Sequence, residues 1–120
     1  MGFILVVDDD EDTRDTLNDV LANEGFDVRL AGRADEALDV ILGLQRPSLV
    51  LLDCRLQGTS GIELLDFLQT RPDLDSVAVV MVSGDSASVP HPRAVALLRK
   101  PYDLDTLLHF ANQYCKVEPR

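Results

Sequence analysis

Short apolar runs recur along the chain, and polar or small residues bound each of them. The runs are rich in Val, Ile and Leu and lie at residues 3–7, 28–31, 49–52, 77–82 and 94–98. Runs of this length and composition are typical of strands that a sheet buries on both faces. The pattern therefore predicts five interior strands.

The segments between these runs carry apolar residues at spacings of three and four, which is the period of an amphipathic helix. They lie within residues 13–24, 34–42, 62–68 and 104–115. Gly25, Gly43 and Pro72 follow the first three segments and are typical of helix ends. Alternating strands and helices predict an α/β fold, in which right-handed crossovers place helices on both faces of a parallel sheet.

The connection between the fourth and fifth runs differs from the others. Residues 83–89 lead into Pro90, His91 and Pro92, and the fifth strand is expected to start near Ala94. Two prolines this close together oppose a regular helix. We therefore predict that the fourth crossover is a single helical turn or an irregular loop.

The length and composition fit one globular domain. The chain has 120 residues, of which 46% are hydrophobic and 27% are charged, so we expect a single domain over residues 1–120. Its 21 acidic and 11 basic residues leave a formal net charge of −10. A surface this negative repels nucleic-acid phosphates and anionic lipids, which argues against both as partners.

Cys54 and Cys115 are the two cysteines, and their spacing does not match a metal site. Two thiols in a chain of this composition favour a reducing compartment. No segment approaches the about 20 apolar residues of a membrane span, and the first residues lack the charged and cleavage regions of a signal peptide. We expect a cytoplasmic protein that does not engage a membrane.

Polar side chains stand at the ends of four of the predicted strands. The first strand is followed by Asp8–Asp10, the third by Asp53, the fourth by Ser83 and the fifth by Lys100. In an open parallel sheet, ligands bind at the carboxyl ends of the strands. If these four strands are neighbours, their terminal side chains share one cleft.

The expected cleft contains three carboxylates, and their negative charge indicates which chemistry it can support. Asp8, Asp9 and Asp53 would repel one another strongly unless protons or a cation neutralise them. Mg2+ suits such hard oxygen ligands, and together with Lys100 it would balance the three negative charges. Phosphoryl transfer needs a metal, an ammonium and a hydroxyl around the transferred group, which Mg2+, Lys100 and Ser83 would supply. Asp53 could then attack phosphorus and form an aspartyl phosphate.

With these residues in place, the chain resembles the receiver domain of two-component response regulators over nearly its whole length. The matching stretches are Ile4–Asp9, Asp53 with Leu56 and residues 58–64 (GTSGIEL), Ser83–Gly84, and Lys100–Pro101. Each motif alone is weak evidence. All four, in this order and at strand ends, are specific.

The resemblance implies roles for the carboxylates. Asp53 is the expected phosphoacceptor, and Asp9, Asp53 and the backbone carbonyl of Arg55 are the expected direct ligands of Mg2+. Asp8 would act on the metal mainly through a bound water molecule. The cofactor implied for the chain is therefore Mg2+.

The resemblance also implies the fold, the remaining site residues and the partners. Ser83 would donate a hydrogen bond to one phosphoryl oxygen, Lys100 would pair with another, and the Lys100–Pro101 peptide would be cis. The sheet would be flavodoxin-like, doubly wound and five-stranded, in the order 2-1-3-4-5. The phosphoryl donor would be a phosphohistidine on a histidine kinase or a histidine phosphotransfer protein, and the domain would signal to an unknown downstream protein by a conformational change.

Three features depart from the family pattern. Gln57 stands where proline is usual, and Leu97 stands where an aromatic side chain usually moves together with the Ser or Thr. The stretch from Ser83 to Lys100 is shorter than usual by more than a helical turn. The last two changes fall on the face that receivers commonly use for output and dimerisation, so we expect an altered relay and a monomer.

Arg55 and Asp85 occupy positions that flank the site and tune the lifetime of the phosphoryl group in this family. Opposite charges there suggest an ion pair across the mouth of the site. We hypothesise that this pair obstructs the attacking water and slows dephosphorylation.

Other polar residues have a structural interpretation. Asp10 and Asp12 fit the N-terminus of the first helix, where negative charge is stabilised. His91 and His109 have no neighbouring ligand residue in the sequence and are expected at the surface.

Three other functions use parts of the same residue set. A haloacid-dehalogenase-like phosphohydrolase has a D-x-D pattern, which Asp8 and Asp10 match, but its nucleophile would be Asp8 and it would leave Asp53 idle. A flavodoxin-like carrier is disfavoured because three aspartates would repel the phosphate of FMN. A receiver-like interaction module that phosphorylation does not switch stays open because of Leu97, although the intact Asp53 and Lys100 argue against it.

Overall fold

The computed structural model describes residues 2–55 and 61–115. Its five strands are β1 (Ile4–Val7), β2 (Val28–Ala31), β3 (Leu49–Asp53), β4 (Ala78–Ser83) and β5 (Ala96–Arg99). All neighbouring strands are parallel, and their order across the sheet is β2-β1-β3-β4-β5. The predicted α/β fold and strand order are therefore confirmed.

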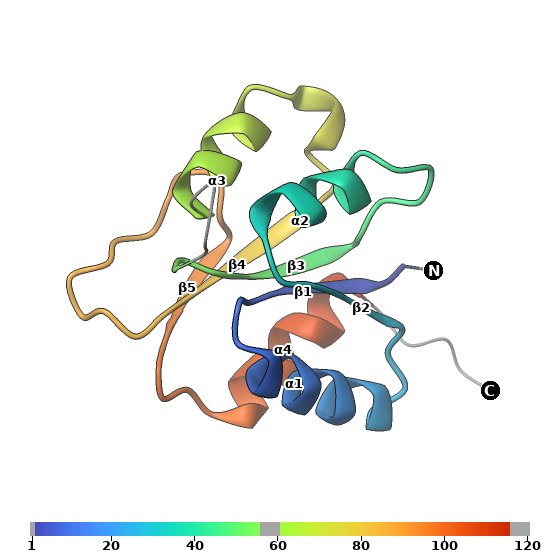
Figure 1. Cartoon of the computed structure of the whole chain (residues 1–120), viewed down its shortest axis with the longest axis vertical. Coiled ribbons are helices and arrows are strands. Elements are labelled where there is room, and N and C mark those ends of the chain that lie inside the picture. The colour runs from blue at the N-terminus through green and yellow to red at the C-terminus, as the bar shows by residue number, and fades with distance from the viewer. Residues whose placement is uncertain (1, 56–60, 116–120) are drawn as a thin grey trace.

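Helices cover both faces of the sheet, as Figure 1 shows. One face carries α1 (Glu11–Asn23) and α4 (Leu104–Tyr114). The other face carries α2 (Ala34–Ile41) and α3 (Gly61–Gln69), and α3 leads into the short 3-10 helix η1 (Pro72–Leu74). Within the described residues, no helix is both long and apolar enough to cross a bilayer.

The alternation of side chains along the strands divides the core into two layers. Leu5 and Val7 of β1 pack with buried residues of α2 and α3, whereas Ile4 and Val6 pack with buried residues of α1 and α4. Burial of apolar surface at about 25 cal/mol per Å2 is what holds the helices on the sheet.

The prediction that all five strands are buried on both faces is wrong for the edge strands. In β2, Arg29 and Leu30 are exposed, and the Arg29 guanidinium lies over the Phe3 ring at 4.0 Å from its centroid. In β5, Ala96 and Leu97 are half-buried and Arg99 is exposed. A strand at the edge of the sheet has a neighbouring strand on one side only, which leaves more of its side chains in contact with solvent.

The first helix, predicted within residues 13–24, spans Glu11–Asn23. The Asp10 side chain caps it by accepting hydrogen bonds from the backbone N–H groups of Asp12 and Thr13. Beyond its end, Gly25 has a φ of 94°, a left-handed conformation that suits glycine. The structural interpretation of Asp10 is thus confirmed.

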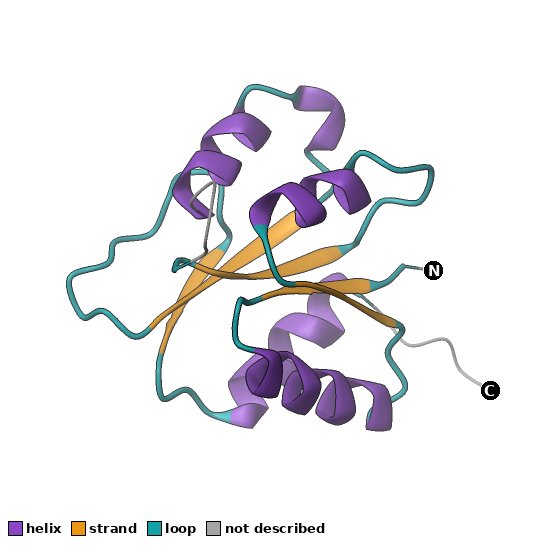
Figure 2. Cartoon of the chain, viewed as in Figure 1, coloured by secondary structure: helices purple, strands orange, loops and turns teal. Residues whose placement is uncertain are grey.

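The connection between β4 and β5 contains no helix over residues 84–95, as predicted (Figure 2). The strand β5 begins at Ala96, two residues after the expected start near Ala94, and the backbone N–H of Ala94 closes a turn with His91. We call residues 84–95 the β4–β5 loop.

His91 is not the isolated surface residue that the sequence suggested. Its side chain is 9% exposed, and Nε2 lies 2.7 Å from Oδ1 of Asp66 on α3. Its ring nitrogen Nδ1 also accepts a hydrogen bond from the backbone N–H of Arg93. The prediction missed this contact because Asp66 lies 25 residues away in the sequence. His109, by contrast, is exposed.

Candidate functional site

Buried polar side chains mark the carboxyl edge of the sheet. Among the described residues, the buried polar or charged ones are Asp8 at 4% exposure, Asp53 at 8% and Ser83 at 3%. Asp8 directly follows β1, and the other two are the last residues of β3 and β4. Burying such groups costs free energy unless partners compensate, so their concentration at one edge points to a site.

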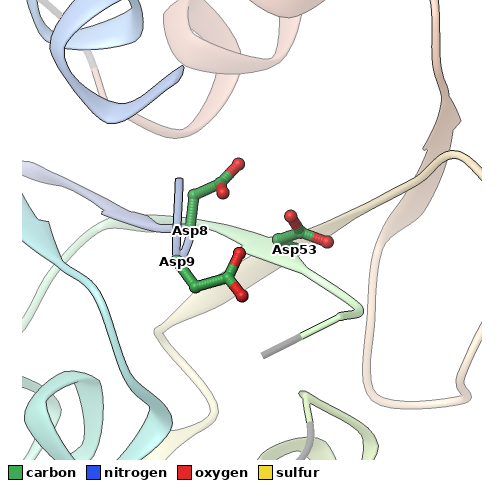
Figure 3. A group of neighbouring side chains, drawn as sticks. All are labelled: Asp8, Asp9 and Asp53. Atoms are coloured by element: carbon green, nitrogen blue, oxygen red, sulfur yellow. The ribbon is translucent and has the colours of Figure 1, made fainter. Parts of the chain in front are cut away.

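Three carboxylates converge there, as Figure 3 shows. Asp8, Asp9 and Asp53 each offer one oxygen, and these oxygens lie within 4.8 Å of one another. Asp8 and Asp53 are buried, and Asp9 is exposed. Carboxylate oxygens at this spacing fit a hard divalent cation, so the donor set is one that could hold a metal ion.

Each buried carboxylate has partners that position it. The Asp10 backbone N–H donates to Oδ1 of Asp8 at 2.9 Å, and the Arg55 backbone N–H donates to Oδ1 of Asp53 at 2.9 Å. The Lys100 ammonium lies 3.5 Å from Oδ2 of Asp53. The structure therefore brings together the acidic residues and the lysine that the sequence singled out.

Backbone pairing at the strand ends places Lys100 beside Ser83. The Lys100 N–H donates to the Ser83 carbonyl at 2.8 Å, which continues the pairing of β4 with β5 by one residue. The Lys100–Pro101 peptide is cis, as expected. Both residues thus line the same edge of the sheet as Asp53.

Burial raises the pKa of the Asp8 carboxyl above its usual range. The nearby Asp53 charge raises this pKa further, while the Asp10 N–H and the Lys100 charge oppose the rise. A cation between the carboxylates would remove this unfavourable electrostatic interaction. The direction of the shift therefore agrees with a site built for a bound cation.

The negative charge of these carboxylates also affects the pKa of two neighbouring side chains, Cys54 and Tyr102. Burial raises the pKa of the Cys54 thiol, and the adjacent Asp53 raises it further. Burial also raises the pKa of the Tyr102 hydroxyl, with additional contributions from Asp8 and Asp53. A thiol with a raised pKa is mostly protonated and a weak nucleophile, so the Cys54 side chain is not expected to react at this site.

Two contacts at this edge were missed from the sequence. In the first, Nη1 of Arg14 on α1 donates a hydrogen bond to the Asp8 carbonyl at 2.7 Å. Gly32 leaves room for this arginine, because a Cβ at that position would lie 2.7 Å from Nη1. The Ser88 hydroxyl lies 2.7 Å from the Ser83 hydroxyl. No local pattern could reveal either contact, because each depends on how a side chain or loop folds back onto the strand ends.

Other sequence-based expectations have different outcomes. Leu56, Gln57 and residues 58–60 lie outside the described residues. Arg55 and Asp85, both described, form no ion pair, and Oδ1 of Asp85 instead accepts a hydrogen bond from the Ala87 N–H. The hypothesis that an Arg55–Asp85 ion pair obstructs the attacking water therefore has no ion pair in the structure to support it.

Comparison with known proteins agrees with this geometry. The family model described as "Response regulator receiver domain" matches residues 4–112. This chain belongs to the response regulator receiver domain family. The four strand-end motifs thus identified the family correctly.

Relatives of this receiver domain include proteins of similar and of much greater length. It is 31% identical over 118 residues to sporulation initiation phosphotransferase F of Bacillus subtilis, covering 96% of this chain and 94% of that protein. It is 38% identical over 112 residues to the nitrogen assimilation regulatory protein NtrX of Azorhizobium caulinodans, covering 88% of this chain but 24% of that protein. The chain therefore spans nearly all of the first relative and about a quarter of the second.

Solved receivers have the same fold. The response regulator TrrA of Thermotoga maritima, solved in complex with Mg2+–BeF, has a TM-score of 0.82 at 26% identity and covers 95% of this chain and 99% of its own. A response regulator receiver protein from Pseudomonas putida has a TM-score of 0.83 at 30% identity, with 93% and 96% coverage. The chain is thus a receiver domain of two-component phosphorelay signalling, a class that interacts with histidine kinases or phosphotransfer proteins. The hydrolase and interaction-module alternatives are not favoured.

Proposed function

We propose that this receiver accepts a phosphoryl group on Asp53 and signals through the resulting change in charge and conformation. The observation that carries the proposal is the convergence of Asp8, Asp9 and Asp53 within 4.8 Å, with the Lys100 ammonium 3.5 Å from Asp53. Asp53 is the carboxylate that this cation pairs with directly. In the hydrolase alternative the nucleophile would be Asp8, and within the described residues no cationic side chain pairs with its carboxylate.

The proposed reaction exchanges one bond at phosphorus for another. A carboxylate oxygen of Asp53 forms a bond to the phosphorus of a phosphohistidine, and the phosphorus–nitrogen bond breaks. The histidine nitrogen keeps the electron pair and ends as a neutral imidazole after taking up a proton. Lys100 pairs with one phosphoryl oxygen, and Ser83 donates a hydrogen bond to another.

The proposed cofactor is Mg2+, held by Asp9, Asp53 and the backbone carbonyl of Arg55, with Asp8 acting through a bound water. The donor set supports this assignment, because all of its atoms are hard oxygens and the burial of Asp8 is unfavourable without a cation. When bound, the ion would neutralise negative charge on the phosphoryl oxygens.

We propose a histidine kinase or a histidine phosphotransfer protein as the donor, and a downstream protein of unknown identity as the receiver of the signal. We also propose that residues 1–120 form one domain that is monomeric and cytoplasmic. The free thiols of Cys54 and Cys115 support a reducing compartment.

Intact-mass measurement tests the acceptor assignment. The protein is incubated with acetyl phosphate or phosphoramidate in the presence of Mg2+, and we expect a single phosphoryl adduct. The adduct should be lost in Asp53→Asn and retained in Asp39→Asn, which alters an exposed aspartate on α2. An adduct that persists in Asp53→Asn but disappears in Asp8→Asn, with repeated turnover of phosphomonoesters, would instead support the hydrolase.

A further inference from the structure

The Ser83 hydroxyl is engaged away from Asp53. Its Oγ lies 2.7 Å from the Ser88 Oγ and accepts a hydrogen bond from the Asp85 N–H at 3.1 Å. Within residues 2–55 and 61–115, neither Asp53 nor Lys100 hydrogen-bonds this hydroxyl. Both of its partners belong to the β4–β5 loop.

Each hydroxyl has one proton, and this identifies which of the two serines donates the hydrogen bond between them. Ser83 is 3% exposed, so its single hydroxyl proton needs a protein acceptor. The Asp85 N–H can only donate, which leaves the Ser88 Oγ as the acceptor. Ser88 is half-buried, so its own proton can reach water. Ser83 therefore donates to Ser88.

Strand alternation places this bond on the face of the sheet opposite to Asp53. Asp53 pairs in register with Val82, which belongs to the core layer beneath α1 and α4. The residue after Val82 points to the other face, where Met81 packs beneath α2 and α3. The loop covers that face, because the His91 N–H contacts the Met81 sulfur at 3.3 Å. To reach a group on Asp53, the Ser83 side chain must change rotamer and leave Ser88.

We propose that Ser88 is a positioning residue that competes with the phosphoryl group on Asp53 for the single proton of Ser83. This inference rests on the proposed function. While Asp53 is unmodified, Ser88 holds the Ser83 hydroxyl toward the loop. A phosphoryl oxygen is a charged and stronger acceptor, so phosphorylation draws the hydroxyl away and breaks the bond to Ser88.

The far end of the loop is fixed independently of Ser88. His91 bonds Asp66 on α3 at 2.7 Å, and the Arg93 guanidinium donates to two backbone carbonyls beside η1. Loss of the Ser83–Ser88 bond therefore releases the stretch around Ser88 and Val89, because Arg99 still holds the carbonyls of Asp85 and Ser86 at 3.5 and 3.4 Å. That stretch includes Val89, whose side chain is 73% exposed, so the change occurs at the surface.

Beryllofluoride binding tests the competition. Affinity for beryllofluoride is measured with Mg2+ present, by fluorine NMR or calorimetry, for the wild type and three variants. Ser88→Ala should bind about two- to tenfold more tightly, the effect of one lost hydrogen bond in the unbound state. Ser88→Thr keeps the hydroxyl and should match the wild type. Ser86→Ala, a serine in the same loop without a side-chain bond to Ser83, should also match it.

The double variant Ser83→Ala/Ser88→Ala shows whether the effect passes through Ser83. Compared with Ser83→Ala alone, the second substitution should leave affinity unchanged. Weaker or unchanged binding in Ser88→Ala, or an equal gain with and without the Ser83 hydroxyl, overturns the proposal. If the wild type neither binds beryllofluoride nor forms an acetyl phosphate adduct, the proposed phosphoacceptor function itself fails.

Discussion

Single residues at the carboxyl edge of the sheet carry charge that folding has to bury. The Asp8 side chain is 4% exposed and faces Asp53, and its main direct compensation is one backbone N–H from Asp10. A carboxylate in such surroundings reduces the stability of the folded state. Binding and catalytic sites commonly keep buried charges that destabilise the folded state, because the same charges are needed for function.

The first prediction concerns the charge on Asp8. Asp8→Asn should raise Tm in metal-free buffer at neutral pH by a few degrees, the change that about 1 kcal/mol produces in a small domain. The amide removes the buried charge, and its oxygen can still accept the Asp10 N–H. Thermal unfolding followed by circular dichroism measures the difference.

The dependence on pH distinguishes this cause from a general change in packing. Because the folded-state pKa of Asp8 is raised, its ionised form is destabilising above that pKa and the destabilisation disappears as acid protonates it. The advantage of Asp8→Asn should therefore shrink on acidification. Asp39→Asn is the surface control and should leave Tm unchanged. An advantage of Asp8→Asn that is constant with pH would contradict the electrostatic explanation.

At the scale of elements, the β4–β5 loop replaces a helix and needs its own anchors. Nη2 of Arg93 donates to the carbonyls of Leu74 and Val77 at 2.8 and 2.7 Å, which ties the loop to η1 and to the start of β4. Nε of Arg93 is buried without a partner among the described residues. The Arg93 side chain thus supplements the Val77 N–H at the Leu74 carbonyl and donates to the Val77 carbonyl.

The second prediction is that Arg93→Ala destabilises the fold by about 1–3 kcal/mol, because the Val77 carbonyl loses its side-chain donor and the Leu74 carbonyl loses one of two donors, keeping the Val77 N–H. Denaturant unfolding measures the loss, and hydrogen exchange should increase around η1 and the start of β4. Arg33→Ala provides the control, since Arg33 forms a surface ion pair with Asp35 at 3.1 Å and should change stability by less than about 0.5 kcal/mol. Equal losses in the two variants would argue against an anchoring role.

At the scale of the whole molecule, negative charge and topology act together. The chain has a formal net charge of −10, and the parallel order of its strands gathers three carboxylates at one edge. Folding therefore gathers carboxylates that could hold a cation, which the unfolded chain does not bring together. A ligand that binds only the folded state stabilises it by mass action.

The third prediction is that Mg2+ raises the free energy of unfolding by about 2.7 kcal/mol when its concentration reaches a hundred times its Kd. Thermal unfolding is compared in MgCl2 and in NaCl of equal ionic strength, which separates binding from screening. EDTA should reverse the effect, and Asp9→Asn should reduce it. A response to NaCl equal to the response to MgCl2 would mean that no specific site exists.

The sequence by itself predicted the α/β fold and singled out the polar residues that the structure brings to one edge of the sheet. Hydrophobic periodicity predicted strands and helices because it depends on neighbouring residues, and the parallel sheet follows from their alternation. The order of the strands, which the family resemblance implied, then brings Asp8, Asp9, Asp53 and Lys100 together at one edge. The proline-bearing segment likewise predicted a crossover of one helical turn or an irregular loop, and the structure has the loop.

Only the tertiary structure decided how the β4–β5 loop is held and what the Ser83 hydroxyl touches. The contacts between His91 and Asp66 and between Ser83 and Ser88 are each 2.7 Å long. Their lengths depend on the path of an irregular loop, which has neither a period nor a regular hydrogen-bond pattern to constrain it. Packing against distant elements sets that path, and the exposure of the edge strands likewise depends on their place in the sheet. Local sequence therefore specifies which groups reach the site, and non-local packing specifies which of them bond to one another.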